Sequence, residues 1–371
     1  MLAFYRKYRP STFNDLIGQE ITVRILQEAA RQDRFSHAYL LSGPRGTGKT
    51  TSARLIAKIV NCEKRANDAA FKSKGEPCNT CEACIAIESG SALDVIELDA
   101  ASNRGIDEIR DLKEHARVSP AVLRRKIFII DEAHMLTKDA ANALLKTLEE
   151  PPPHLIIILA TTEPEKLPAT IISRTQQFNF KKAGLKDIII KLGKIARDER
   201  IAVSEEALEL IAASSEGSFR DAEALLDQAA IAGKDEISRG AIEKLLGRAG
   251  FQVIARLAEN ILKNNLSGAL EIINEVSESG INLTDFTKDL LIHLRRLALL
   301  AHHPGMKSLF SNEMTDENLK ETERQAGFFE KRHLAIIKSL IGAYENIRYS
   351  QFPIIPLEIA VIEEMGKNAA I

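Results

Sequence analysis

The sequence lacks any long hydrophobic run. Its longest purely apolar stretch, residues 155–160, has six residues, whereas a membrane-spanning helix needs about 20. The basic N-terminus is followed by no hydrophobic signal region. These absences argue against a membrane span and a secretory signal, so we expect a cytoplasmic protein.

An excess of charge of one sign is also missing. The net charge is −2 and the pI is near 6.5, so the chain as a whole does not attract nucleic acid. Any contact with DNA must come from a locally basic face or from a partner. With 371 residues, of which 45% are hydrophobic and 27% charged, the chain has the composition of an ordinary globular protein of two or three domains.

Cysteine is scarce and is confined to one segment, where it occurs as Cys62, Cys78, Cys81 and Cys84. Two C-x2-C spacings and one more distant cysteine fit a tetrahedral zinc site with four cysteine ligands, in an insertion of about residues 61–89. Because four thiolates leave no open coordination position, we expect this zinc to be structural. Unliganded reduced thiols are the alternative, since a reducing cytoplasm disfavours disulfides.

A phosphate-binding motif lies between a predicted strand, residues 38–41, and a predicted helix, residues 51–58. The motif G-x-x-x-x-G-K-[ST] is formed by Gly43-Pro44-Arg45-Gly46-Thr47-Gly48-Lys49-Thr50. Backbone N–H groups of such a P-loop, and the N-terminus of the helix after it, surround phosphate groups. We expect Lys49 to reach the β and γ phosphates, Thr50 to bind Mg²⁺, and Thr51 to join the nucleotide site.

Two further predicted strands end in polar side chains. Residues 126–130 are followed by Asp131, expected to hold Mg²⁺, and by Glu132, expected to polarise the water that attacks the γ phosphate. An acidic strand end without function is the alternative. Residues 155–160 are followed by Thr161 and Thr162, whose hydroxyls face the ligand crevice that open α/β sheets form at their strand ends.

Four other candidates stay open on residue chemistry alone. The segment Tyr5-Arg6-Lys7-Tyr8-Arg9-Pro10 either packs on a purine ring or is a solvated arm. Before a predicted helix at 106–117, Ser102-Asn103-Arg104 either receives an anion such as a DNA phosphate or caps the helix. Arg174 is a surface arginine by default. Arg220 either swings over the nucleotide or faces solvent.

Beyond Lys181 the periodicity is helical throughout. A small lid is predicted from helices at 185–198, 204–214, 219–231 and 238–246, with Ser204 and Ser238 as N-caps and Gly233 as a helix stop. After Gly250, two apolar helix faces predict the core of an antiparallel bundle. They are formed by Leu283, Phe286, Leu290, Leu294 and Leu297, and by Leu334, Ile337, Ile341 and Tyr344.

Taken together, the motifs resemble the gamma/tau subunit family of bacterial DNA polymerase III, the motor of the sliding-clamp loader. The P-loop, the cysteines and Asp131-Glu132-Ala133-His134 carry this resemblance. Three more motifs do so as well: Asn142-Ala143-Leu144-Leu145-Lys146-Thr147-Leu148-Glu149-Glu150-Pro151-Pro152, Ser173-Arg174, and Gly217-Ser218-Phe219-Arg220-Asp221. The resemblance covers essentially the whole chain and is most specific from residue 5 to residue 221.

The resemblance implies a fold and a set of ligands. The fold is an α/β P-loop AAA+ ATPase with a parallel sheet and the four-cysteine zinc insertion (residues 1–180), then an all-helical lid (181–248) and an all-helical collar that oligomerises (249–371). The implied cofactors are ATP, Mg²⁺ and Zn²⁺. The implied partners are delta-type and delta-prime-type subunits, copies of the chain in a ring, the beta sliding clamp and primed DNA in a bacterial replisome.

The resemblance also implies residue roles. Arg174 is the arginine finger that enters a neighbouring site, Arg220 is the lid sensor, and Thr162, in preference to Thr161, is the sensor at the strand end. Tyr8 and Pro10 contact the purine, and the segment from Ser102 to Arg110 faces DNA. The family often has cysteine after the finger, where this chain has Thr175. Because the chain stops at the length of the shorter gamma form, we expect the helicase and polymerase contacts of a longer tau form to be absent.

Two rival functions have weaker support. A DEAH-type helicase shares the motif at residues 131–134, but it needs two tandem RecA-like domains, and the helical C-terminal half offers no second one. A non-hydrolysing clamp-loader scaffold has a degraded P-loop, whereas Lys49, Thr50, Asp131 and Glu132 are intact here. No polymerase active site is expected, because a lone Mg²⁺-binding acidic pair does not make a nucleotidyl-transfer site.

Overall fold

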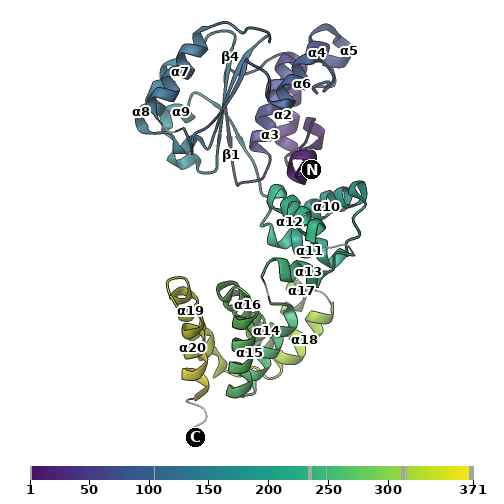
Figure 1. Ribbon diagram of the computed structural model, residues 1–371, viewed down its shortest axis with the longest axis vertical. Helices are drawn as coiled ribbons and strands as arrows, with labels where there is room; N and C mark the ends of the chain where they lie inside the picture. Colours follow the sequence, from purple (N-terminus) through teal and green to yellow (C-terminus); the bar gives the residue numbers. More distant parts are fainter. Residues whose placement is uncertain are drawn as a thin grey trace. The chain divides into compact units, whose positions relative to one another are not determined.

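The computed structural model describes residues 2–103, 105–232, 236–247, 249–310, 314 and 316–366. Arg104 and Gly233 therefore lie outside the described residues, as do the ends of the predicted lid and collar at 248 and 371. The chain divides into two compact units, Met1–Ile237 and Ser238–Ile371, and Figure 1 shows their elements. Within the described part of the chain, no helix is both long and apolar enough to cross a membrane.

A parallel five-stranded sheet forms the centre of the first unit, in the order β2-β3-β4-β1-β5. The strands are β1 (Ala38–Ser42), β2 (Val95–Asp99), β3 (Lys126–Asp131), β4 (Leu155–Thr161) and β5 (Gln176–Asn179). Their C-terminal ends are aligned, since Ser42 is paired with Thr161 and Asp99 with Asp131. One edge of the sheet thus collects every predicted strand-end side chain.

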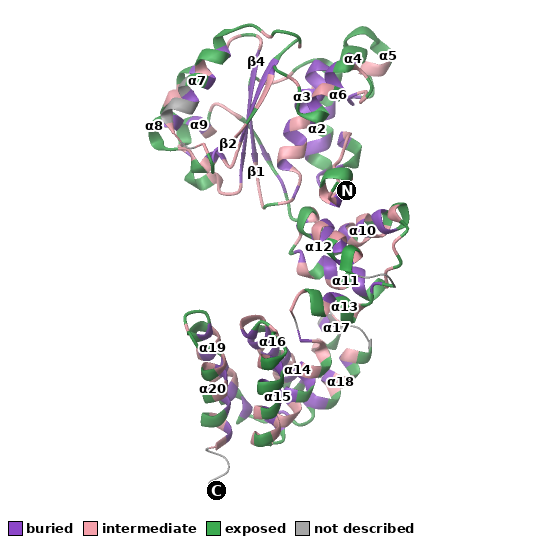
Figure 2. Ribbon diagram, viewed as in Figure 1, coloured by how far each residue is buried: buried purple, intermediate pink, exposed green. Residues whose placement is uncertain are grey.

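Helices cover both faces of this sheet (Figure 1). One face packs against α2 (Glu20–Gln32), α3 (Lys49–Asn61) and α6 (Glu82–Ser89), and the other against α7 (Ile106–Arg117), α8 (Lys138–Glu149) and α9 (Ala169–Ile172). Central strands of a sheet covered on both faces need apolar side chains in both directions. That requirement explains the continuous apolar runs of β3 and β4, which Figure 2 shows as buried.

The predicted parallel α/β module is confirmed, with additions that the sequence did not signal. A short helix α1 (Phe4–Lys7) and a 3-10 turn η1 (Phe13–Asp15) precede α2, where we expected no helix before residue 19. Other short elements lie in the connections: α4 (Glu63–Asn67), α5 (Ala69–Lys72), η2 (Ala133–Met135) and η3 (Pro164–Lys166). Such one-turn helices are too short to show a hydrophobic period.

Three helices complete the first unit: α10 (Leu185–Glu199), α11 (Glu205–Ser214) and α12 (Phe219–Ala232). Ser204 caps α11, as predicted, by accepting a hydrogen bond from the Ala207 N–H at 3.2 Å. The start of α12 lies on the P-loop, because the Phe219 N–H donates to the carbonyl oxygen of Gly46 at 3.2 Å. This contact places the helix of Arg220 beside the predicted phosphate site.

The described part of the second unit is helical. It contains α13 (Arg239–Leu245), α14 (Phe251–Leu262), α15 (Leu266–Glu278), α16 (Leu283–His302), η4 (Pro304–Met306), α17 (Lys307–Phe310), α18 (Asp316–Ala326), α19 (His333–Ile347) and α20 (Ile354–Gly366). Ser238 caps α13 through the Ala241 N–H, as predicted. The predicted apolar face of α16 is buried from Leu283 to Leu297.

The second predicted core face, on α19, is confirmed only in part, because of its four residues only Ile337 packs against the core of this unit. The helix packs on α16 and α20 through His333, Ile336, Leu340, Ala343 and Ile347. Of the predicted residues, Leu334 is 38% exposed and Ile341 is 48% exposed. The helix carries apolar residues on two adjacent faces, and three-to-four spacing does not tell which one the neighbouring helices cover. Figure 2 shows exposed positions along both α19 and α20.

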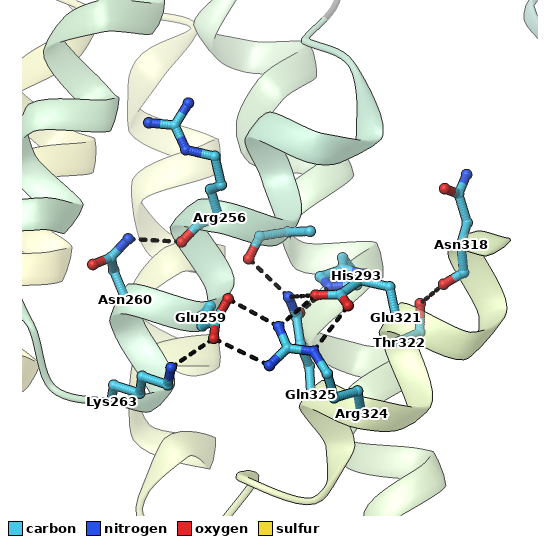
Figure 3. A network of polar contacts seen from close by, with 11 residues as sticks. Arg256, Glu259, Asn260, Lys263, His293, Asn318, Glu321, Thr322, Arg324 and Gln325 are labelled. Atoms are coloured by element: carbon cyan, nitrogen blue, oxygen red, sulfur yellow. Dashed lines mark hydrogen bonds and ion pairs between the residues drawn. The ribbon is translucent and has the colours of Figure 1, made fainter.

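A polar network fixes α18 on α14 and α16 (Figure 3). The Arg324 guanidinium donates to both carboxylate oxygens of Glu259, at 3.3 and 3.0 Å. The buried Gln325 amide donates to the Ala255 carbonyl at 3.0 Å and accepts at 2.9 Å from Nε2 of His293. Burial lowers the pKa of His293 and so keeps the ring neutral, with its proton on Nε2.

Asp94 secures the edge pairing of β2 with β3. Its carboxylate is 2% exposed and accepts three backbone hydrogen bonds of 2.8 Å, from the N–H groups of Ala121, Val122 and Leu123. Burial raises the pKa of Asp94, but these three donors and Lys126 outweigh it and leave the pKa below its usual value. Because this pKa is depressed in the folded state, the ionised carboxylate stabilises the fold at neutral pH.

We predict that Asp94→Asn lowers the free energy of unfolding by about 2–3 kcal/mol at pH 7, because charge-assisted hydrogen bonds are lost. The difference from the wild type should begin to shrink as pH falls below the usual aspartate pKa of about 4, and it should be lost as pH falls through the lower pKa of the folded carboxylate. Urea unfolding at pH 7 and at a series of pH values below 4 measures both effects. The exposed Asp111→Asn is the matched control, and a difference that does not depend on pH would contradict the assignment.

Candidate functional site

The P-loop joins the end of β1 to the start of α3 and adopts a backbone that requires glycine. Gly43 has φ +140°, and a Cβ there would lie 2.3 Å from the carbonyl oxygen of Phe180. Gly46 has φ +73°, and a Cβ there would lie 1.9 Å from Oγ of Ser218. These glycines let the loop pass tightly under the lid while the N-terminus of α3 stays directed at the cavity.

The side chain of Lys49 folds back onto the loop that precedes it. Its ammonium group donates to the carbonyl oxygens of Gly43 at 2.7 Å and Pro44 at 2.8 Å. The hydroxyl of Thr47 donates to the same Pro44 oxygen at 2.8 Å. Burial lowers the pKa of Lys49, while the charges of Glu132 and Asp131 raise it. The ammonium is thus held at the acidic strand end.

A direct hydrogen bond connects the P-loop to β3. The Thr50 hydroxyl donates to Oδ2 of Asp131 at 2.7 Å, and Oδ1 of Asp131 accepts from the Glu132 N–H at 2.9 Å. A hydroxyl and a carboxylate side by side are the hard oxygen ligands that Mg²⁺ prefers. The donor set therefore fits a magnesium ion at the place where the sequence predicts one.

Glu132 lies in a cluster of polar side chains from β3 and β4. Its backbone is left-handed, with φ +47°, and its Oε2 accepts a hydrogen bond of 3.2 Å from the Thr162 hydroxyl. His134 reaches the same carboxylate, with Nδ1 at 3.5 Å, and also contacts the buried Thr161 hydroxyl at 2.9 Å. No role was predicted for His134 from the sequence, although it stands in the acidic motif.

A cavity of about 240 Å³ opens over these groups within the first unit. Eleven predicted site residues line it: Pro10, Arg45, Gly46, Thr47, Gly48, Lys49, Thr50, Thr51, Asp131, Glu132 and Arg220. The lining residues do not include Tyr8, Gly43, Pro44, Thr162 or Arg174. Tyr5 and Arg9 of the candidate N-terminal segment also line the cavity, as do Lys191 and Glu223, for which we predicted no role.

The N-terminal segment forms one wall of the cavity. The Arg220 guanidinium lies 5.0 Å from the centre of the Tyr5 ring. Tyr8 points elsewhere, since its hydroxyl donates to Oε1 of Glu199 on α10 at 2.7 Å. Burial and Glu199 raise the pKa of Tyr8 to about 12. The tyrosine on the cavity wall is therefore Tyr5, and not Tyr8, which the family resemblance implied.

Arg174 lies just after α9. Its guanidinium pairs with Oε1 of Glu149 at 2.8 Å and donates to the Thr170 carbonyl oxygen at 2.9 Å. The side chain remains 36% exposed. Within its own chain, Arg174 thus has surface partners and no place on the cavity wall.

The segment before α7 does not cap the helix, which was one of the two alternatives we considered for it. Ser102 and Asn103 fold back on Asp99: the Ser102 hydroxyl donates to Oδ2 at 3.1 Å, and the Asn103 side-chain amide donates to the carbonyl oxygen at 3.2 Å. The N-cap of α7 is Gly105, which supplies no side chain. The third residue of the proposed anion site, Arg104, lies outside the described residues.

The four cysteines come together, as their spacing predicted. Their Sγ atoms all lie within 4.8 Å of one another, and those of Cys78 and Cys84 are 3.9 Å apart. A tetrahedral site with Zn–S bonds of about 2.3 Å has sulfur–sulfur edges of roughly 3.8 Å. The side-chain hydrogen bond between Cys62 and Cys84 lowers the pKa of the Cys62 thiol to about 4 and raises the pKa of the Cys84 thiol. A cation such as Zn²⁺ would let all four ionise.

Local backbone structure prepares this cluster for a metal. Asn79 is left-handed, with φ +59°, which turns the chain so that the Thr80 and Cys81 N–H groups donate to Sγ of Cys78 at 3.4 and 3.3 Å. Cys62 ends α3, and Cys84 lies in the first turn of α6. The residues thus fit zinc, and the metal would join α3 to α6.

The insertion is anchored to the wall of the cavity. The buried Glu76 accepts hydrogen bonds from the N–H groups of Phe13 at 2.8 Å and Asn14 at 3.0 Å, and from the Gln27 side chain at 2.7 Å. The next residues along the N-terminal segment, from Asp15 to Ile17, line the cavity. The segment just before Cys78 therefore supports the N-terminal wall through the Glu76 carboxylate.

Comparison with known proteins gives a consistent set of relatives. Three family models match successive parts of the chain: "DNA polymerase III, delta subunit" at 18–184, "DNA polymerase III clamp loader subunit, ATPase lid domain" at 187–235, and "DNA polymerase III subunits gamma and tau domain III" at 237–367. The DNA polymerase III subunit gamma of Buchnera aphidicola is 37% identical over 81% of this chain and 80% of its own length.

Longer relatives match as well. The DNA polymerase III subunit tau of Bacillus subtilis is 42% identical over 97% of this chain, and that of Escherichia coli is 40% identical over 86%. The chain spans 62% and 48% of their lengths. Among solved structures, the RuvB Holliday junction branch migration motor of Thermotoga maritima is 20% identical, with a TM-score of 0.46 over 74% of this chain and 86% of that one.

We predict one zinc ion per chain, and Cys81→Ser should lower the zinc content because the tetrahedral site loses a ligand. The same change should expose the insertion to limited proteolysis between residues 63 and 80. Elemental analysis and mass spectrometry of the fragments measure the two effects, with the exposed Ser89→Ala as control. Wild-type protein that is free of zinc after purification without chelator would sink the assignment.

Proposed function

The chain belongs to the family of DNA polymerase III gamma and tau subunits, which are clamp-loader subunits, and from this premise we propose that it binds and hydrolyses MgATP to load a sliding clamp onto primed DNA. The observation that carries the proposal is one cavity lined by Lys49, Thr50, Asp131 and Glu132. Each of the four has a chemical role in phosphoryl transfer.

The proposed roles follow from position and chemistry. Lys49 neutralises the β and γ phosphates, and the P-loop N–H groups hold phosphate oxygens. The Thr50 hydroxyl and the Asp131 carboxylate hold Mg²⁺, which supplies charge neutralisation at the phosphates. Glu132 orients and deprotonates the attacking water. Thr162 binds Glu132 at 3.2 Å, so a sensor role for this threonine would operate through the general base.

Residues outside the motifs complete the proposed nucleotide site. Arg220 extends from the lid to the cavity, and Pro10 and Tyr5 supply the apolar wall for a purine ring. For Tyr8 we propose a supporting role, because its hydroxyl holds the N-terminal segment to α10 through Glu199. An intact set of catalytic side chains speaks against a scaffold subunit without hydrolysis.

For Arg174 we propose action in trans, on the nucleotide of an adjacent subunit. Two observations support this role: the side chain is 36% exposed, and it is not among the residues that line its own cavity. An arginine that stabilises the charge on the transferring phosphoryl group accelerates hydrolysis by roughly 10³ to 10⁵-fold. In a ring of subunits, the ion pair with Glu149 would be exchanged for this contact.

The proposed partners are delta-type subunits, further copies of the chain, the sliding clamp and primed DNA. For self-association we propose the outer faces of α19 and α20. Their exposed apolar residues are Leu334, Ile341, Ile355, Ile359 and Ile362. We keep the division into an ATPase module (1–180), a lid (181–248) and a collar (249–371) as part of the proposal.

The central test separates binding from chemistry. Lys49→Ala should lose ATP binding, because the cation at the phosphates is removed, whereas Glu132→Gln should bind ATP and lose at least about 10²-fold in hydrolysis rate. Calorimetric titration and a phosphate-release assay measure the two properties on the assembled complex. Hydrolysis by Glu132→Gln at the wild-type rate would show that Glu132 is not the general base.

The trans role of Arg174 is tested by mixing variants. Arg174→Ala should keep ATP affinity and lose about 10³-fold in hydrolysis rate, and adding Lys49→Ala chains should restore activity, because some interfaces then pair an intact P-loop with an intact finger. Glu149→Ala, which removes the ion-pair partner and keeps the arginine, is the matched control and should hydrolyse ATP normally. If mixed oligomers form and no mixing ratio restores hydrolysis, Arg174 is a surface arginine.

A further inference from the structure

A buried carboxylate faces the proposed nucleotide cavity from the lid. Glu223 of α12 is 3% exposed and lines the cavity together with Arg220. The two residues are three positions apart on one helix, so their side chains leave the same helix face. A buried charge is costly unless it is paired. The role of Glu223 can therefore be inferred from the cation that pairs with it.

That partner is Lys191 of α10. Its Nζ lies 2.6 Å from Oε1 of Glu223, and the two side chains are 14% and 4% exposed. The ammonium also lies 5.0 Å from the centre of the Phe219 ring, at the start of α12. Burial raises the pKa of Glu223, and the charges of Lys191 and Arg9 oppose that rise. Cations from α10 and from the N-terminal segment thus converge on one lid carboxylate.

The same three segments meet at two other points. Lys7 and Tyr8 of the N-terminal segment contact Glu199 at the end of α10, at 2.5 and 2.7 Å. The Arg220 guanidinium lies 5.0 Å from the Tyr5 ring. Glu223 is the only one of these contact residues that is at once buried and on the helix of Arg220. It is therefore the group best placed to control where Arg220 lies.

The sign of the charge argues that Glu223 does not bind the nucleotide directly. Arg9, Arg45, Lys49 and Arg220 line the cavity and suit a triphosphate. Unlike Asp131 and Glu132, which we assign to Mg²⁺ and to the attacking water, a further carboxylate in the same wall repels that ligand. We therefore look for the role of Glu223 in its ion pair with Lys191, and not in a contact with the ligand.

We propose that Glu223 is a positioning residue for nucleotide binding: its ion pair with Lys191 holds α12 against α10 and so places Arg220 over the phosphate end of the cavity. This inference rests on the proposed function, because it requires that the cavity bind ATP. Its consequence is that removing a negative charge from the wall weakens the binding of an anion. A bystander carboxylate would have the opposite effect.

The test compares ATP with ADP in the full-length chain. Glu223→Gln keeps the volume and removes the charge, so Arg220 should lose its position and the ratio of ATP to ADP affinity should fall by roughly 5-fold or more. Arg220→Ala should lower the ratio similarly. The double variant should have the same ratio of ATP to ADP affinity as Arg220→Ala alone, because both substitutions remove the same interaction, that of Arg220 with the phosphates. Asp221→Asn, an exposed acid on the same helix, is the control and should leave the ratio unchanged. Calorimetric titration gives both affinities, and thermal unfolding reports stability.

The contrary outcomes are distinct. Tighter ATP binding by Glu223→Gln would identify a bystander charge and overturn the inference. An equal loss of ATP and ADP affinity with a lower unfolding temperature would identify a purely structural ion pair and overturn it too. If Arg220→Ala leaves the ratio unchanged while ATP still binds, Arg220 is not the group that Glu223 positions, and the inference fails while the nucleotide site stands. A wild-type chain that binds no ATP would overturn the proposed function itself.

Discussion

The arrangement of the proposed nucleotide site depends on the parallel register of β1, β3 and β4. The pairs Ser42 with Thr161 and Ile130 with Leu159 bring three strand ends to one edge. The hydrogen bond of 2.7 Å from Thr50 to Asp131 is possible only in this register. A slip of one residue would shift Asp131 by about 3.3 Å and turn its side chain to the other face. The register of the sheet therefore also fixes the positions of the side chains that we propose for phosphate and magnesium binding.

The second dependency is the close approach of the lid to the P-loop. Gly46 leaves no room for a Cβ beneath Ser218, and its carbonyl oxygen accepts the Phe219 N–H at 3.2 Å. The start of α12 is thus seated on the loop that is to hold phosphate. Arg220 and Glu223 follow on the same helix, so any shift of the loop is transmitted to both. The lid is therefore part of the proposed site, because α12 contacts the P-loop and carries two residues that line the cavity.

Sequence patterns predicted this molecule well where a motif encodes its own backbone. The P-loop, the acidic strand end and the cysteine turns lie where the spacing placed them, because each works through local geometry. Prediction failed where the same sequence pattern is compatible with two different structures. On α19 the series through Leu334 and the series through Ile336 have the same helical spacing, and only the packing against α16 and α20 selects the second. Near α7, Ser102 has the chemistry of a cap but donates instead to Asp99.

The sequence by itself determined which residues we propose for phosphate, magnesium and zinc binding, because those proposals follow from residue type and short spacing. Only the tertiary structure decided what surrounds them. It placed Tyr5 rather than Tyr8 on the cavity wall, since Glu199, almost 200 residues away along the chain, holds the Tyr8 hydroxyl. It also set Lys191 against Glu223, a pair that no motif contains. Contacts between distant segments arise from packing, and packing leaves no signature in local sequence.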